Sequence, residues 1–62
     1  MPNDGLYFLV NVSVADSRGG HLTRSYRVHA EDAFAASGAA EDQAYLDYLN
    51  VVEAHTVWVK EA

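Results

Sequence analysis

The sequence contains no cysteine and little basic charge. With no thiol among its 62 residues, the chain cannot form disulfides or thiolate metal sites. It has four Lys and Arg against nine Asp and Glu, which gives a formal net charge of −5. Nucleic-acid binders need Lys and Arg to replace phosphate counterions, so this balance predicts no direct nucleic-acid binding. An acidic protein is instead attracted to a larger basic protein or nucleoprotein complex.

The sequence also lacks a long apolar run and a basic N-terminal segment. Residues 1–5 read as a short polar lead-in, and a membrane-spanning helix needs roughly 20 apolar residues. We therefore expect no signal peptide, no membrane contact and a cytoplasmic location. Half of the residues are hydrophobic, which favours a single small domain over residues 1–62. A chain this short has a thin core, and a homodimer would be one way to stabilise it.

The strongest local signal is a stretch of alternating polarity near the N-terminus. Its even-numbered residues are all apolar: Leu6, Phe8, Val10, Val12 and Val14. This period of two predicts a strand from Leu6 to about Ala15, with the even-numbered face turned inward. We expect it to be the central strand of the sheet, with Val10 and Val12 as the most buried residues.

A cluster of turn residues follows this strand. Gly19 stands where a three-residue hairpin loop needs a left-handed residue, so Ser17-Arg18-Gly19 is the expected loop. The loop fixes the register, placing Val10 opposite Tyr26 and sorting polar from apolar residues on both faces. The second strand is then expected from His21 to about His29.

The segment from Ala30 to Asn50 predicts a helix over about 31–50. It is rich in Ala, has no Pro or β-branched residue, and carries Glu31 and Asp32 where acids favour the helix dipole. Ser37-Gly38 predicts a break or kink in one continuous element, with two separate helices as the alternative. A stripe of large side chains is expected to cover the inner sheet face: Phe34, Tyr45, Tyr48 and Leu49.

The stretch His55–Lys60 predicts a third strand. We expect Val57 and Val59 to share the inner face and Trp58 to lie on the open face, with the reverse orientation as the alternative. The order β-β-α-β then predicts an α+β fold with a three-stranded antiparallel or mixed sheet in the order 2-1-3. The third strand would be antiparallel to the first and parallel to the second, with the helix packed on one sheet face.

Two charged residues fall on faces that are otherwise apolar. Arg24 lies on the inner face of the second strand, and Glu41 lies on the inner stripe of the helix. A buried charge needs a partner, so we expect these two side chains to form an ion pair at the rim of the sheet.

Catalytic, cofactor and metal sites are not expected. His29, Glu31 and His55 are the nearest approach to a metal set, but their spacing is not that of a zinc motif. Ser13 and Ser25 lie on the open face with no histidine expected beside them, although nucleophilic catalysis needs a neighbouring base. We therefore expect a protein that acts by binding, with a minimal enzyme or metal binder as the weakest alternative.

Two surfaces are candidates for binding a partner. From Ala30 to Ala54 the sequence has six acids and no base, which predicts either simple solubility or an acidic face aimed at a basic partner. The acids expected to point away from the sheet are Asp32, Asp42 and Asp47. The open sheet face is expected to carry residue types common at interface hot spots, together with their neighbours: Tyr7, Leu9, Arg27, His29 and Trp58.

In size, acidity and small α+β layout, the chain resembles the inhibitors that phages encode against host defence complexes, such as anti-CRISPR proteins. This resemblance implies inhibition without catalysis, by occupying a nucleic-acid-binding or partner surface of a larger complex. The alternative is a structural homo-oligomer joined through open sheet faces or edge strands.

Overall fold

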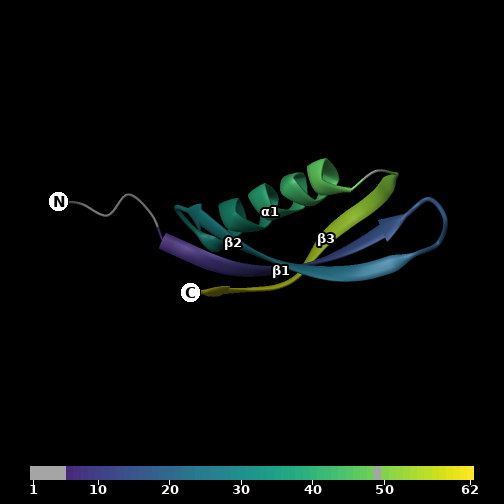
Figure 1. Cartoon of the computed structure of the whole chain (residues 1–62). Coiled ribbons are helices and arrows are strands. Elements are labelled where there is room, and N and C mark those ends of the chain that lie inside the picture. The colour runs from purple at the N-terminus through teal and green to yellow at the C-terminus, as the bar shows by residue number, and fades with distance from the viewer. Residues whose placement is uncertain (1–5, 49) are drawn as a thin grey trace.

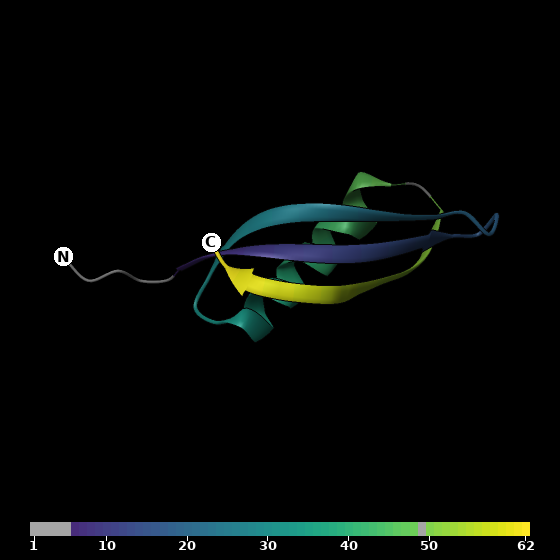
Figure 2. The same cartoon turned by 90° about the horizontal axis from the view of Figure 1, so that it is seen from below.

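The computed structural model describes residues 6–48 and 50–62. Within them the chain forms β1 (Leu6–Asp16), β2 (His21–Ala30), α1 (Ala33–Asp47) and β3 (Val51–Glu61). The strands form one sheet in the order β2-β1-β3, and α1 lies across one of its faces (Figure 1). Figure 2 shows the opposite sheet face, which no helix covers. The predicted α+β architecture and strand order are confirmed.

The β1–β2 pairing has the predicted register along its whole length. Val10 is opposite Tyr26 on the helix side, and Leu9 is opposite Arg27 on the open side. This register places the apolar side chains of both strands on the helix side. A shift of one residue would move every side chain of a strand to the other face and would lose this arrangement. β3 also pairs antiparallel with β1, so it runs parallel to β2 as expected.

The hairpin loop is the predicted three-residue turn. Gly19 has a φ of +88°, which a residue with a side chain adopts only with strain. The Asp16 carboxylate accepts hydrogen bonds from the backbone N–H groups of Gly20 at 2.8 Å and Arg18 at 2.9 Å. These two bonds hold the pKa of Asp16 below its ordinary value, because they favour the charged form.

β3 is longer than predicted and contains irregularities. Its pairing with β1 shifts between Asn11 and Val12, because Trp58 faces Asn11 and Thr56 faces Val12, which leaves Val57 as an extra residue. Val57 is exposed, whereas Val59 packs against the core. The expectation that these two valines share a face was therefore wrong, since the bulge interrupts the alternation that it assumed.

The core lies between the inner sheet face and α1. Val10 and Val12 have no exposed surface and are the largest fully buried side chains, as predicted. The helix contributes only small residues to this core: Ala36, Ala40 and Ala44. These alanines follow one another at intervals of four, so they form a single stripe along the helix.

The large side chains of α1 do not cover the sheet, which corrects the prediction from the sequence. Phe34 is 90% exposed, Leu46 is 80% exposed, and Tyr45 also faces solvent. Tyr48, at the end of the helix, is half-buried. Leu49 lies outside the described residues. The inner sheet face already fills the space with aromatic and branched side chains, so only the alanine stripe leaves room for close packing.

The helix runs without interruption from Ala33 to Asp47, so the predicted break at Ser37-Gly38 is absent. Asp32 is the N-cap, and its carboxylate accepts a hydrogen bond from the Ala35 N–H at 2.8 Å. The helix is thus shorter at both ends than expected. The Ser37 hydroxyl donates to the Ala33 carbonyl at 2.9 Å, which keeps this serine compatible with the helix.

Candidate binding surfaces

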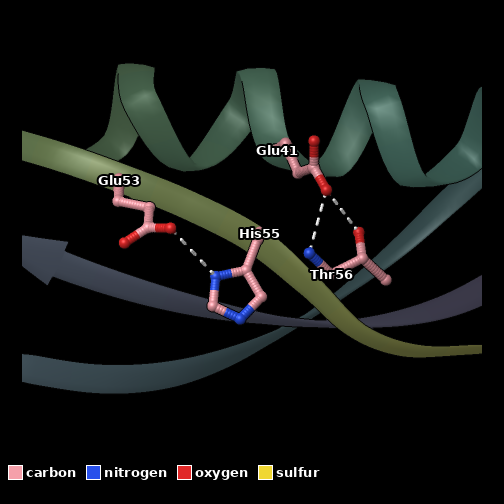
Figure 3. Close-up of polar contacts among 4 residues, drawn as sticks. All are labelled: Glu41, Glu53, His55 and Thr56. Atoms are coloured by element: carbon pink, nitrogen blue, oxygen red, sulfur yellow. Dashed lines mark hydrogen bonds and ion pairs between the residues drawn. The ribbon is translucent and has the colours of Figure 1, made fainter.

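Glu41 binds the backbone and side chain of β3 instead of forming the predicted ion pair with Arg24. Its Oε2 accepts hydrogen bonds from the Thr56 N–H at 2.9 Å and the Thr56 hydroxyl at 2.8 Å (Figure 3). The Arg24 guanidinium lies 5.8 Å from the centre of the Tyr48 ring. The ion-pair prediction was wrong because these two residues face opposite edges of the sheet: Arg24 belongs to β2, and Glu41 contacts β3.

Two of the three acids predicted to point outward instead accept hydrogen bonds from other groups of this protein. Asp32 caps α1, and Asp47 accepts hydrogen bonds from the Tyr26 hydroxyl at 3.0 Å and the Gln43 amide at 2.8 Å. Asp47 therefore faces β2 and does not point away from the sheet. Burial raises the pKa of Tyr26, and the bond to Asp47 raises it further. Asp42, the third of these acids, is exposed, and its side chain makes no hydrogen bond to another described residue.

The outer α1 surface combines exposed large side chains with negative charge. We define it by four residues: Phe34, Asp42, Tyr45 and Leu46. At 100° per residue they span about 120° of the helix, opposite the alanine stripe. The sequence argument missed this surface because it ranked residues by hydrophobicity. The spacing of Ala36, Ala40 and Ala44 was the available signal.

The open sheet face carries all five residues predicted for it. The register places Tyr7 beside His29 and Leu9 beside Arg27, on the face away from α1. β3 adds Trp58 opposite Asn11, so the alternative in which Trp58 turns inward does not hold. Lys60 also lies on this face, opposite Leu9, and was not among the predicted residues. We call this group the cationic–aromatic patch: Tyr7, Leu9, Arg27, His29, Trp58 and Lys60.

Several contacts order the side chains of the patch. The Arg27 guanidinium lies 4.4 Å from the centre of the Tyr7 ring, and the ring of His29 lies 4.8 Å from it. On the other side of Leu9, the Lys60 ammonium lies 5.8 Å from the centre of the Trp58 ring. Each cation therefore lies near an aromatic ring, a favourable electrostatic arrangement that leaves its hydrogen-bond donors on the surface.

Further along the open face, β3 places a histidine beside a serine, contrary to the sequence prediction. Ser13 is opposite His55, whose Nδ1 lies 3.8 Å from Glu53 Oε2 (Figure 3). The side chains of His55 and Glu53 are both more than half exposed. A nucleophile needs its base within hydrogen-bond reach, and no such bond joins Ser13 to His55 within the described part of the chain.

The structure also contains a small pocket near the hairpin end of the core. Its volume is about 150 Å³, and it is lined in part by Leu22, Tyr48 and Val51. Ligand pockets usually have volumes of about 300–1,000 Å³, so this hollow is small for an organic substrate. Among residues 6–48 and 50–62, no three metal-ligating side chains come together.

Comparison of the chain with protein-family models, curated proteins and solved structures gives no match. In the described ranges, no helix has the length and apolar character needed to cross a bilayer. The two surfaces are therefore interpreted from their own chemistry.

Proposed function

We propose that this chain is a non-catalytic, acidic protein-binding module that docks on a larger partner through the outer α1 surface. The observation that supports this most is the inverted helix, which buries alanines and exposes Phe34 and Leu46. The partner that fits is a basic, nucleic-acid-binding surface of a larger protein or nucleoprotein complex. Binding there would block the partner, as the resemblance to phage-encoded inhibitors implies. Such a partner is met inside the cell, so a cytoplasmic location belongs to the proposal.

The apolar residues supply the anchors for this docking. Burying a large apolar side chain contributes about 1.5–3 kcal/mol, and neither Phe34 nor Leu46 gains this in the isolated chain. Tyr45 adds an aromatic ring with a polar end, a type enriched in binding hot spots. Tyr45 and Leu46 are neighbours in the chain, and Phe34 lies on the same side of the helix about 17 Å along its axis, so the surface offers a partner two apolar contact points.

The charges around these anchors indicate what kind of partner fits. Helix α1 and the link before it carry five acids and no base: Glu31, Asp32, Glu41, Asp42 and Asp47. On the helix, Asp42 lies between Phe34 and Leu46 in angular position. A complementary surface therefore has apolar sockets bordered by Lys or Arg, and the long-range attraction speeds encounter with such a surface.

The proposal is tested by comparing variants of the two surfaces in capture from the native host lysate. We expect Phe34→Ser combined with Leu46→Ser to lose the partner while keeping the folded circular-dichroism spectrum. Asp42→Lys should weaken capture and reduce its dependence on salt, because the surface charge that salt screens is reversed. The matched control is Trp58→Ala on the opposite face. If the Phe34 and Leu46 double variant captures the partner normally while Trp58→Ala does not, docking through the outer α1 surface is refuted.

Self-association is a second candidate function, favoured by the sheet edges. β2 and β3 are the outer strands of the sheet, so each has one side without a paired strand among the residues that the structure describes. Such edges are templates for pairing with another copy. Sedimentation over a wide concentration range tests this candidate, which requires an increase in mass with concentration.

A further inference from the structure

The cationic–aromatic patch lies on the face opposite the proposed docking surface and has a regular arrangement across the sheet. Leu9 on the central strand is flanked by Arg27 on β2 and Lys60 on β3. Adjacent strands lie about 4.8 Å apart, so these two cations start about 10 Å from each other. Tyr7 and Trp58 follow on either side of this row along the strands. The result is a flat band of two cations and two aromatic rings.

Trp58 is held in place by the sheet beneath it. With the Asn11 amide oriented to fit its neighbours, its oxygen accepts from the Trp58 indole N–H at 3.0 Å. The amide nitrogen of Asn11 donates to the Arg24 carbonyl at 3.2 Å. The only polar atom of the indole is therefore satisfied within the protein, while 42% of the residue remains exposed. A ring fixed in this way loses little freedom when another flat group stacks on it.

The net charge of −5 is not evenly distributed between the two faces of the sheet. The patch contains no acid, and the acids of α1 lie on the other side of the sheet. Packed layers are about 10 Å apart, while the Debye length is about 8 Å at physiological salt. The described open face has one acid, Glu53, opposite Ala15 and about 20 Å along β1 from Leu9. An anionic ligand on the patch is thus largely screened from Glu53 and the acids of α1, and the nearest acid is Glu61, which follows Lys60 but lies opposite Phe8 on the inner face.

The rest of the open face indicates the class of ligand. Beyond the patch, its floor consists mainly of short polar residues without charge: Asn11, Ser13, Thr23 and Ser25. A protein hot spot is usually a desolvated apolar pocket, whereas this surface is flat and has Leu9 as its one aliphatic member among the patch residues. Flat aromatic rings beside cations are how proteins bind single strands, by stacking on bases and contacting phosphates.

From this geometry we propose that the patch binds single-stranded nucleic acid. Trp58 stacks on a base, and Arg27 and Lys60 contact phosphates on either side of Leu9. The proposal does not depend on the outer α1 surface, because the two sites lie on opposite faces. It opposes the prediction of no nucleic-acid binding, which treated the charge of the chain as uniform.

Trp58 is the only tryptophan of the chain, so its fluorescence reports on the site directly. Titration with a single-stranded oligothymidine should quench this fluorescence. With two phosphate contacts, the affinity should fall about sevenfold between about 50 and 200 mM salt. Replacing Arg27 or Lys60 with Gln should lower the salt dependence by about half, since each removes one contact. Asp42→Asn, on the other face, should leave binding within about twofold of the parent.

A labelled oligonucleotide followed by anisotropy extends the test to variants without the tryptophan. Trp58→Ala should bind about 5- to 150-fold more weakly, and Trp58→Tyr should restore part of the loss because it retains an aromatic face. Circular dichroism of each variant confirms that the fold persists. The proposal is overturned if the parent shows no quenching at low salt. It is equally overturned if polyglutamate of matched length binds as tightly, since the patch would then recognise an acidic protein segment.

Discussion

Because α1 packs its alanines on the sheet and exposes its large side chains, two substitutions in the helix should lower the stability by very different amounts. Ala40 is fully buried against the sheet, whereas Leu46 is 80% exposed. Ala40→Leu inserts three additional carbon atoms into a closed layer, and such overpacking costs about 1–3 kcal/mol. Leu46→Ala removes a side chain of which only one fifth is buried, which corresponds to about 0.3–0.6 kcal/mol. Alanine also has the higher helix propensity, which offsets part of this small loss.

These free energies translate into distinct melting temperatures. For a domain of this size, 1 kcal/mol shifts the midpoint by about 4–8 °C. We expect Ala40→Leu to melt about 4–24 °C below the parent and Leu46→Ala to remain within about 5 °C of it. Thermal unfolding followed by circular dichroism at low protein concentration provides the measurement, since dilution limits any self-association.

The reverse ranking would refute this reasoning. If Leu46→Ala destabilised the protein more than Ala40→Leu, the large side chains would be inside and α1 would be rotated about its axis. Ala40→Ser is a useful companion because it changes polarity with little change in volume. Its cost should be smaller than that of Ala40→Leu if crowding is the cause.

Three further predictions concern the turn and the polar contacts of the helix. Gly19→Val should destabilise the fold by about 1–2 kcal/mol in urea unfolding, while Gly19→Asn should lose less, because Asn adopts a positive φ with less strain than a β-branched residue. Glu41→Gln should cost about 1 kcal/mol in the same assay, and the cost should be smaller in a Thr56→Val background, since the hydroxyl bond is then already lost while the backbone N–H bond remains. The raised pKa of Tyr26 favours the neutral phenol in the folded state, so its stabilisation is present below about pH 10 and lost as the pH rises further. Tyr26→Phe should therefore show a smaller loss of stability above about pH 10 than the parent in urea unfolding.

The strand register could be read from the sequence because its determinants are local. Alternation along β1 and a glycine at the left-handed position of the loop together allow one pairing, and Val10 opposite Tyr26 follows. The bulge in β3 could not be read in this way. Val57 is itself apolar, so the alternation around it looks regular until pairing with β1 is known.

Which face of α1 packs on the sheet depends on how much space the side chains of the sheet leave. The sequence of α1 alone does not show how much space that is. A helical wheel favours the face with the largest apolar residues, here Phe34 and Tyr45. The sheet beneath was already filled by its own side chains, including Val12 and Tyr26. The candidate acids were misplaced for a related reason. Short carboxylates such as Asp32 readily bind nearby backbone groups, so local hydrogen bonding decides their direction.

The alanine stripe has a mechanical consequence. Large side chains interdigitate deeply with a facing sheet, whereas the methyl groups of this stripe interdigitate less and so define the position of the helix along its axis less strictly. Polar contacts therefore help to fix the position of the helix, and the described residues include one such contact to each edge strand: Glu41 with Thr56 on β3 and Asp47 with Tyr26 on β2. Because these bonds are on opposite edges, we expect loss of one pair to leave the other in place, and loss of both to leave the position of the helix fixed by packing alone. Hydrogen bonds at the rim of the sheet thus contribute to the placement of Phe34 and Leu46 on the far side of the helix.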